Sequence, residues 1–309
     1  MVLMRYSITR LVLGCQQSVD LTPEKYAEAK KAKEQLLVAL SIEEKLNLVL
    51  ENYAEFEEEL QGLTLRQLIF SDGDWSSFIG ELQTVNRRLA NLLSACRLYI
   101  DQIKHEISAL YGFDSAQYQA LGQAFSAEYD GYLGYRVLEA LRNHVQHRSL
   151  PVHNLTYNGS REEKPNRMLC RHACTPSLSI ARIKEEGNFK AQVLAELEGD
   201  DDLVDLKPLV REYVTSIGRV HQGLRQRMHS DVEAWEEVIH SIRARFCETH
   251  GDKTAGLAVI AIDADQRVRE STQVFEEMIT RRRRLEQKNR NVGQLRSHYV
   301  SSAVVGDDA

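Results

Sequence analysis

Residues that interrupt regular structure are scarce in this sequence. Only 5 prolines and 17 glycines occur among 309 residues, so helices meet few breaks, and collagen-like and turn-dense all-β folds are excluded. The 5 cysteines are odd in number and widely spaced, unlike the disulfide framework of a small secreted domain. The short apolar stretch at residues 1–15 is interrupted by Arg5 and Arg10, which excludes a signal-peptide core or a membrane span there. We therefore expect a cytoplasmic protein with free thiols and no membrane partner.

The remaining composition is that of a globular protein. Hydrophobic residues make up 43% of the chain and charged residues 27%, which is too apolar for a disordered protein. The formal net charge is −6, which argues against a protein that coats nucleic acid through its overall charge. Any contact with nucleic acid must therefore be local.

Hydrophobic spacing predicts helix over most of the chain. Apolar residues recur at alternating steps of four and three, the pattern of helices packed lengthwise on one another. The expected helices cover about 22–60, with a possible break at Ser41, then 74–112, 115–148 and 207–246. We therefore expect a mostly all-α fold, an up-and-down helical bundle with a small irregular or β insertion and a C-terminal extension.

The expected bundle occupies residues 20–250 and contains the insertion at 149–206. Asn, Gly, Ser and Pro become frequent after Pro151, and Leu178–Ile183 alternates enough to predict a short strand. The acidic run at 199–202 is expected to form a solvated turn and the start of a helix, because consecutive acids are not spaced around a cation.

The expected C-terminal extension covers residues 251–309. Gly256–Ile262 predicts one apolar strand, and a charged helix containing Arg281–Arg284 is expected to follow from about Arg267. The last ten residues are expected to fray. Arg281–Arg284 is expected to be a solvated face, with binding of phosphate or of an acidic partner as the alternative.

Polar side chains crowd the end of the 115–148 helix. At roughly 100° per residue, Asn143 and His147 lie about 40° apart on the side opposite the buried stripe, and Arg142 flanks them. These three side chains can converge on one ligand. His144 instead projects beside Leu141, so we expect it to be a packed or hydrogen-bonded structural histidine.

The pairing of His147 with Arg142 suits phosphodiester cleavage. Imidazole takes or gives a proton near neutral pH, and guanidinium offers a fixed fork to a phosphate. The 2′-hydroxyl of RNA is itself a nucleophile, so a histidine and an arginine suffice without a metal ion or another cofactor.

A basic island surrounds this motif in an otherwise acidic protein. Residues 136–184 hold nine basic and three acidic side chains, a net charge of +6. Such an island can hold a phosphate backbone. The candidate RNA contacts are Arg136, Arg148, Arg167 and Arg171.

The motif resembles that of the HEPN superfamily (higher eukaryotes and prokaryotes nucleotide-binding). In that family an arginine followed by a polar residue precedes a histidine by four to six positions near the end of a bundle helix. The resemblance implies that Arg142 and His147 form the catalytic pair, with Asn143 as the polar companion. It also implies a metal-independent endoribonuclease of a toxin–antitoxin, phage-defence or CRISPR setting. The resemblance further implies a homodimer with a shared cleft, and an antitoxin or another defence-system protein as a partner.

The same loose spacing occurs at three other places in the chain. These are Arg148 to His153, Arg167 to His172 and Arg245 to His250. The first runs through a proline, the second lies in the irregular insertion, and in the third an apolar residue follows the arginine. Asn143 and the helix that ends at a proline distinguish the Arg142 motif.

Two alternatives remain. One is a non-catalytic helical module that binds RNA or another protein. The other concerns zinc, because Cys170, His172 and Cys174 follow one another closely, with His153 upstream. A second pair of ligands at the usual spacing is missing, and we therefore expect no metal site.

Overall fold

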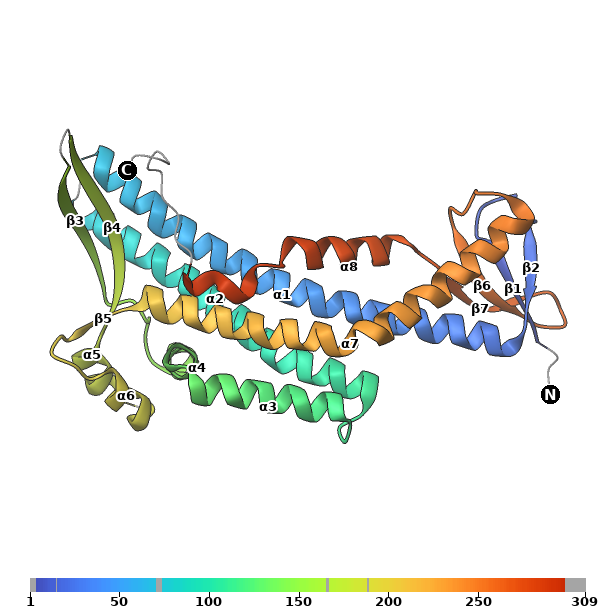
Figure 1. Ribbon diagram of the computed structural model, residues 1–309, viewed down its shortest axis with the longest axis horizontal. Coiled ribbons are helices and arrows are strands. Elements are labelled where there is room, and N and C mark those ends of the chain that lie inside the picture. Colours follow the sequence, from blue (N-terminus) through green and yellow to red (C-terminus); the bar gives the residue numbers. More distant parts are fainter. Residues whose placement is uncertain (1–3, 15, 71–73, 165–166, 188, 298–309) are drawn as a thin grey trace. The chain divides into compact units, whose positions relative to one another are not determined.

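The computed structural model describes residues 4–14, 16–70, 74–164, 167–187 and 189–297 (Figure 1). The chain is mostly helical and contains two small antiparallel sheets. The helices are α1 (Pro23–Ile69), α2 (Trp75–Tyr111), α3 (Ala116–Gly131), α4 (Leu133–His147), α5 (Ile180–Glu186), α6 (Ala191–Leu197), α7 (Leu206–His250), α8 (Glu277–Lys288) and the 3-10 helix η1 (Val292–Ser297). The strands are β1 (Arg5–Arg10), β2 (Ser18–Leu21), β3 (Asn154–Lys164), β4 (Arg167–Ser179), β5 (Leu203–Asp205), β6 (Leu257–Ile262) and β7 (Val268–Gln273).

The chain divides into two compact units made of interleaved segments. Unit 1 comprises Met1–Glu44, His105–Gln117 and Gly223–Asn289. Unit 2 comprises Lys45–Lys104, Tyr118–Gln222 and Arg290–Ala309. The long helices α1, α2 and α7 therefore contribute residues to both units. None of the helices in the described residues is both long and apolar enough to cross a membrane.

Unit 1 is built around a four-stranded sheet in the order β2-β1-β6-β7 (Figure 1). All three strand pairs are antiparallel, and Ile8 of β1 lies opposite Val259 of β6. Both side chains are fully buried. The sequence of β6, Leu-Ala-Val-Ile-Ala-Ile, is apolar throughout because this strand lies between two others and faces the core.

Unit 2 is a helical assembly with a long β-hairpin. Its core contains fully buried side chains from four helices, among them Phe56, Leu89, Tyr99, Val137 and Tyr213. The β3–β4 hairpin pairs antiparallel from Asn154↔Ser177 to Lys164↔Arg167, and β5 joins β4 only near Ser177. Figure 1 shows this hairpin as an extended two-stranded ribbon.

Several helix predictions are confirmed. Helix α2 ends at Tyr111, before Gly112 with φ +89°, and α7 runs through the whole of 207–246. The break considered at Ser41 is absent from α1, because the Ser41 hydroxyl binds Glu106 of α2 over 2.8 Å and does not compete for the helix backbone.

The single helix expected over 115–148 is wrong, because the chain breaks at Tyr132 into α3 and α4. Tyr132 has an extended backbone (φ −131°, ψ 121°). Arg136 of α4 donates to the carbonyl oxygens of Tyr129 and Asp130 over 2.9 and 2.8 Å. These bonds satisfy carbonyls at the end of α3, so the break carries little cost in lost hydrogen bonds.

The short strand expected at 178–183 is wrong in its position. Strand β4 is longer and ends at Ser179, where α5 begins. Ser179 caps this helix by accepting the Arg182 amide, and Asp202 of the acidic run accepts the Ala181 amide over 2.7 Å. The insertion 149–206 is therefore mainly a β-hairpin with two short helices, and all of it belongs to unit 2.

The two ends of the chain differ from expectation as well. Arg5–Arg10 and Ser18–Leu21 form strands β1 and β2, and a strand, β7, precedes α8 where a helix from Arg267 was expected. The strand expected at Gly256–Ile262 is confirmed as β6. The tail expected to fray, residues 300–309, lies outside the described residues. The expected extension 251–309 is shared between units 1 and 2.

Candidate functional site at the end of helix α4

Helix α4 has one buried face, as its sequence predicts. Val137, Leu138 and Leu141 are fully buried, and His144 extends the same stripe with only 2% of its surface exposed. At the start of the helix the amide of Gly134 donates to Glu212 of α7 over 2.7 Å. A Cβ atom on Gly134 would lie 2.6 Å from the carbonyl oxygen of Leu209, so α4 approaches α7 closely only because glycine stands here.

The three motif residues lie on the outer side of α4. Asn143 and His147 are exposed, and Arg142 is half-buried. Arg142 Nη1 donates a 2.9 Å hydrogen bond to Asn143 Oδ1. In the described part of the chain Arg142 has no carboxylate partner, and its Nε atom is buried without a hydrogen-bond acceptor. Among the described residues the Arg142 charge therefore has no carboxylate counterion, and the guanidinium is oriented by Asn143.

His144 is a structural histidine, as expected. Its Nε2 atom lies 2.7 Å from Glu186 Oε2 and 3.1 Å from Ser149 Oγ. The ring also meets Phe189 edge-on, with centroids 6.1 Å apart. Sequence reasoning missed Glu186 and Ser149, because no pattern links a carboxylate 42 residues away across an insertion to this helix.

Hydrogen bonds join the segment that follows α4 to two other elements, α2 and β4. Asn86 of α2 binds Val152 twice, donating to its carbonyl over 2.9 Å and accepting its amide over 2.8 Å. The His153 amide donates to Ser177 over 2.9 Å, and His153 Nδ1 accepts the Ser179 amide over 3.0 Å. The helix end that displays the motif is therefore held in a fixed backbone conformation.

Buried polar groups of this region have shifted pKa values. Burial lowers the pKa of His153, and the nearby charge of Arg182 lowers it further. Burial tends to raise the pKa of Glu186, but hydrogen bonds from Ser149 and His144 outweigh that effect and lower it. Near neutral pH, Glu186 is therefore ionised and His153 is neutral.

The four candidate RNA-binding arginines differ in their surroundings. Arg136 pairs with Glu196 of α6 and also binds the end of α3, so its charge is used within the protein. Arg148 and Arg171 are exposed. The side chain of Arg167 lies outside the described residues.

The basic island is weaker than the residue count indicates. Lys184 binds Glu198 over 2.7 Å, and Arg136 pairs with Glu196. The range 136–184 ends directly before a segment, 185–198, that is rich in acidic residues. Two glutamates of that segment pair with basic residues of the island. Two of its positive charges are therefore neutralised.

The possible zinc ligands do not form a cluster. Cys170, His172 and Cys174 occupy every second position along β4. Cys174 is buried, whereas Cys170 and His172 are exposed. Burial raises the pKa of the Cys174 thiol to about 11. Within the described residues no three His, Cys, Asp or Glu side chains are placed to hold a metal ion.

The arginine run of α8 lies in unit 1, and most of it is ion-paired. Arg281 pairs with Glu44, and Arg282 and Arg283 both pair with the buried Glu236. Arg281 and Arg283 are exposed, as expected of a solvated face, whereas the Arg282 side chain is mostly buried. Because all three are ion-paired, the alternative of phosphate binding is weakened. Arg284 is exposed.

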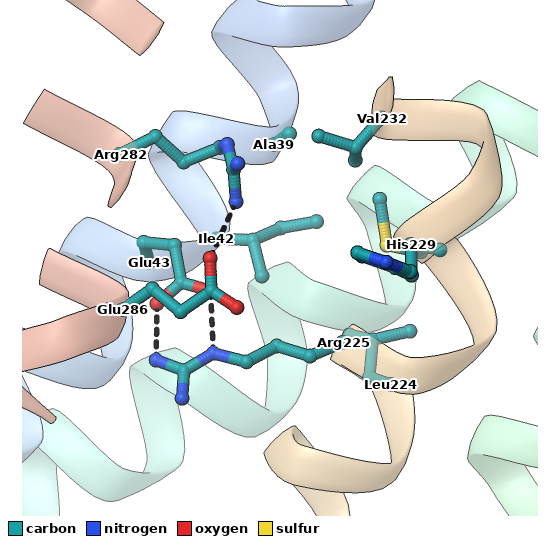
Figure 2. A pocket seen from close by; sticks show the side chains of 10 residues that line it. Ala39, Ile42, Glu43, Leu224, Arg225, His229, Val232, Arg282 and Glu286 are labelled. Atoms are coloured by element: carbon teal, nitrogen blue, oxygen red, sulfur yellow. Dashed lines mark hydrogen bonds and ion pairs between the residues drawn. The ribbon is translucent and has the colours of Figure 1, made fainter. Parts of the chain in front are cut away.

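A small pocket adjoins this run in unit 1 (Figure 2). Apolar side chains such as Leu224 form part of its lining, and Figure 2 shows the ion pairs of Glu43 with Arg225 and of Arg282 with Glu286 across it. Its volume of about 40 Å³ admits water-sized groups but not a nucleotide. We therefore place the candidate site on α4.

Comparison with known proteins leaves the α4 motif as the main guide to function. None of the protein-family models, curated proteins or solved structures that were compared with the chain matches it. The functional argument therefore rests on the side chains at the end of α4 and on the contacts that hold them.

Proposed function

We propose that this protein is a metal-independent endoribonuclease of the HEPN type. The observation that carries the proposal is the arrangement at the end of α4, where Arg142 binds Asn143 over 2.9 Å and His147 is exposed one turn away. A guanidinium without a carboxylate partner among the described residues, on the same helix end as an exposed imidazole, can receive a phosphodiester from solvent.

The proposed reaction uses the 2′-hydroxyl of the substrate. His147 removes the proton of that hydroxyl, its oxygen attacks the adjacent phosphorus, and the 5′-oxygen of the next nucleotide leaves with a proton. The products are a 2′,3′-cyclic phosphate and a 5′-hydroxyl. Arg142 stabilises the additional negative charge on the phosphorane, and Asn143 holds the guanidinium in its orientation.

The proposal includes a homodimer built from an up-and-down bundle. One motif offers a single useful histidine, whereas cleavage gains from both a base and an acid. A two-fold axis supplies the second histidine from an identical site. We place this dimer in the cytoplasm, with RNA as substrate and an antitoxin or other defence-system protein as partner.

A non-catalytic interaction module is the second candidate, and one surface of unit 2 favours it. The end of α1 and the start of α2 expose Leu65, Leu68, Ile69, Phe70 and Trp75. Trp75 is 76% exposed and stacks on Phe78 with ring centroids 6.1 Å apart. Exposed apolar groups of this kind often mark a protein interface. This surface is also compatible with a nuclease that has a protein partner.

The direct test is incubation of the purified protein with end-labelled RNA of mixed sequence in EDTA. We expect cleavage, cyclic phosphate ends and resistance of a 2′-deoxy analogue. Complete loss of cleavage in EDTA, or efficient cleavage of DNA, would overturn the mechanism. Intact RNA under every condition would favour the interaction module, and light scattering would then show whether the dimer exists without the activity.

A further inference from the structure

Three side chains form a closed polar triangle behind the motif, which we call the α4 latch: His144, Ser149 and Glu186. Glu186 Oε2 lies 2.7 Å from His144 Nε2 and 2.5 Å from Ser149 Oγ, and these last two atoms lie 3.1 Å apart. The His144 side chain is fully buried, whereas that of Glu186 is 31% exposed. A single carboxylate oxygen thus binds residues on both sides of His147.

We propose that Glu186 is a positioning residue for the ribonuclease site, acting through His144 and Ser149 on the helix end that carries Arg142 and His147. The inference rests on the function proposed above. Glu186 does not touch the RNA in this account. Its role is to keep the last turn of α4 and the residues after it in one conformation, so that His147 meets the substrate at a fixed distance from Arg142.

The hydrogen-bonding pattern of His144 supports this role. A carboxylate oxygen 2.7 Å from Nε2 requires the proton on that nitrogen, since ionised Glu186 only accepts. His144 Nδ1 is buried and has no partner among the described residues, so a proton there would be an unpaired buried donor. The latch therefore selects the Nε2–H tautomer and fixes the orientation of the ring.

The support of Glu186 is itself rigid. It is the last residue of α5, and Gly187 follows with φ +66°, a conformation that favours glycine. The start of α5 is capped by Ser179 and by Asp202, whose carboxylate accepts the Ala181 amide over 2.7 Å. Glu186 therefore extends from a helix whose first turn is capped by two side chains.

The motif depends on the latch because the His147 side chain makes few contacts that would fix its position. His147 is exposed, and within the described part of the chain its side chain makes no hydrogen bond or ion pair. It follows His144 by three residues and precedes Ser149 by two. The latch therefore determines where the His147 backbone lies.

The test compares Glu186→Ala, Glu186→Gln and Ser149→Ala with wild type, and Glu185→Gln is the matched control on the exposed side of α5. Nitrogen-15 NMR of the histidine rings reports the His144 tautomer, and amide hydrogen exchange reports the opening of residues 148–153. Cleavage of labelled RNA gives kcat and KM. Glu186→Gln retains an oxygen that accepts both hydrogen bonds, so it should rescue much of the effect of Glu186→Ala.

We expect Glu186→Ala to lose the single tautomer, to exchange faster at 148–153 and to lower kcat by about tenfold to 100-fold with KM nearly unchanged. Glu185→Gln should match wild type.

An unchanged tautomer and unchanged exchange in both Glu186→Ala and Ser149→Ala would overturn the latch. An unchanged kcat with the latch lost would overturn its positioning role. If wild type cleaves no RNA, the ribonuclease proposal fails, whereas NMR and exchange still decide whether the latch exists. Should Glu186→Ala not fold, Ser149→Ala carries the same comparison.

Discussion

Arg142 Nη1 lies 2.9 Å from Asn143 Oδ1, so two adjacent residues of α4 bind each other through their side chains. Adjacent helical residues normally point about 100° apart, and this contact turns the guanidinium towards Asn143. The side-chain amide is neutral, so it orients Arg142 without cancelling its charge.

The first prediction separates orientation from charge. Asn143→Ala should lower RNA cleavage by about tenfold, because Arg142 loses its orientation. Asn143→Asp should lower cleavage by roughly 100-fold, because a carboxylate next to Arg142 neutralises the guanidinium and repels phosphate. Initial cleavage rates of both variants provide the comparison. An aspartate variant as active as the alanine variant would contradict the role of Arg142.

The second prediction concerns stability. His144→Ala should lower the free energy of unfolding by about 1–3 kcal/mol, because it removes the buried hydrogen bonds of His144 to Ser149 and Glu186 and opens a space in the core. His147→Ala should change it by less than about 0.5 kcal/mol, because that side chain is exposed. Urea unfolding of both variants measures the difference. Equal stability of the two would mean that the buried bonds of His144 contribute nothing.

The third prediction concerns pH. The pKa of folded His153 lies below the usual value of 6.5, mainly because of burial. As the pH falls through 6.5, His153 of the unfolded chain becomes protonated before His153 of the folded chain does. The free energy of unfolding therefore decreases as the pH falls. His153→Gln should remove part of this loss between about pH 7.5 and about pH 5.5.

Urea midpoints at both pH values measure the effect, and His172→Gln on the exposed part of β4 is the control. A wild-type-like loss of stability in His153→Gln would show that His153 is not the group responsible.

The fourth prediction concerns unit 1. Arg225 binds the buried carboxylate of Glu43 through two nitrogens, with a Nε–Oε1 distance of 2.7 Å (Figure 2). Glu43→Ala should cost about 3–5 kcal/mol, because it leaves the Arg225 charge uncompensated. The double variant Glu43→Leu/Arg225→Met should recover most of that loss, because it removes both charges and fills the space. Urea unfolding of the single and double variants tests this, and strictly additive losses would refute the pairing.

The spacing of apolar residues in the sequence is sufficient to predict the long helices. Apolar residues spaced by three and four predict α2 and α7 with nearly correct ends, because those residues pack against neighbouring helices along their whole length. The same reasoning predicts the buried face of α4, including His144.

Structure that depends on distant partners was not predictable in this way. Strand β1 pairs with β6, more than 240 residues later, and its short alternating sequence, Arg-Tyr-Ser-Ile-Thr-Arg, does not reveal that partner. The break at Tyr132 depends on Arg136, whose guanidinium binds carbonyls at the end of α3. Glu186 reaches His144 only because α5 folds back onto α4, and no spacing rule in the sequence carries that information.

The most direct measurement for the whole account is cleavage of one labelled RNA in EDTA by wild type, His147→Ala and Gln146→Ala. Gln146 is the exposed neighbour of His147 on the same helix turn, so its variant controls for any change of the surface. The account predicts that wild type and Gln146→Ala cleave alike and that His147→Ala loses cleavage by at least about 100-fold with an unchanged circular dichroism spectrum. Full cleavage by His147→Ala would contradict it.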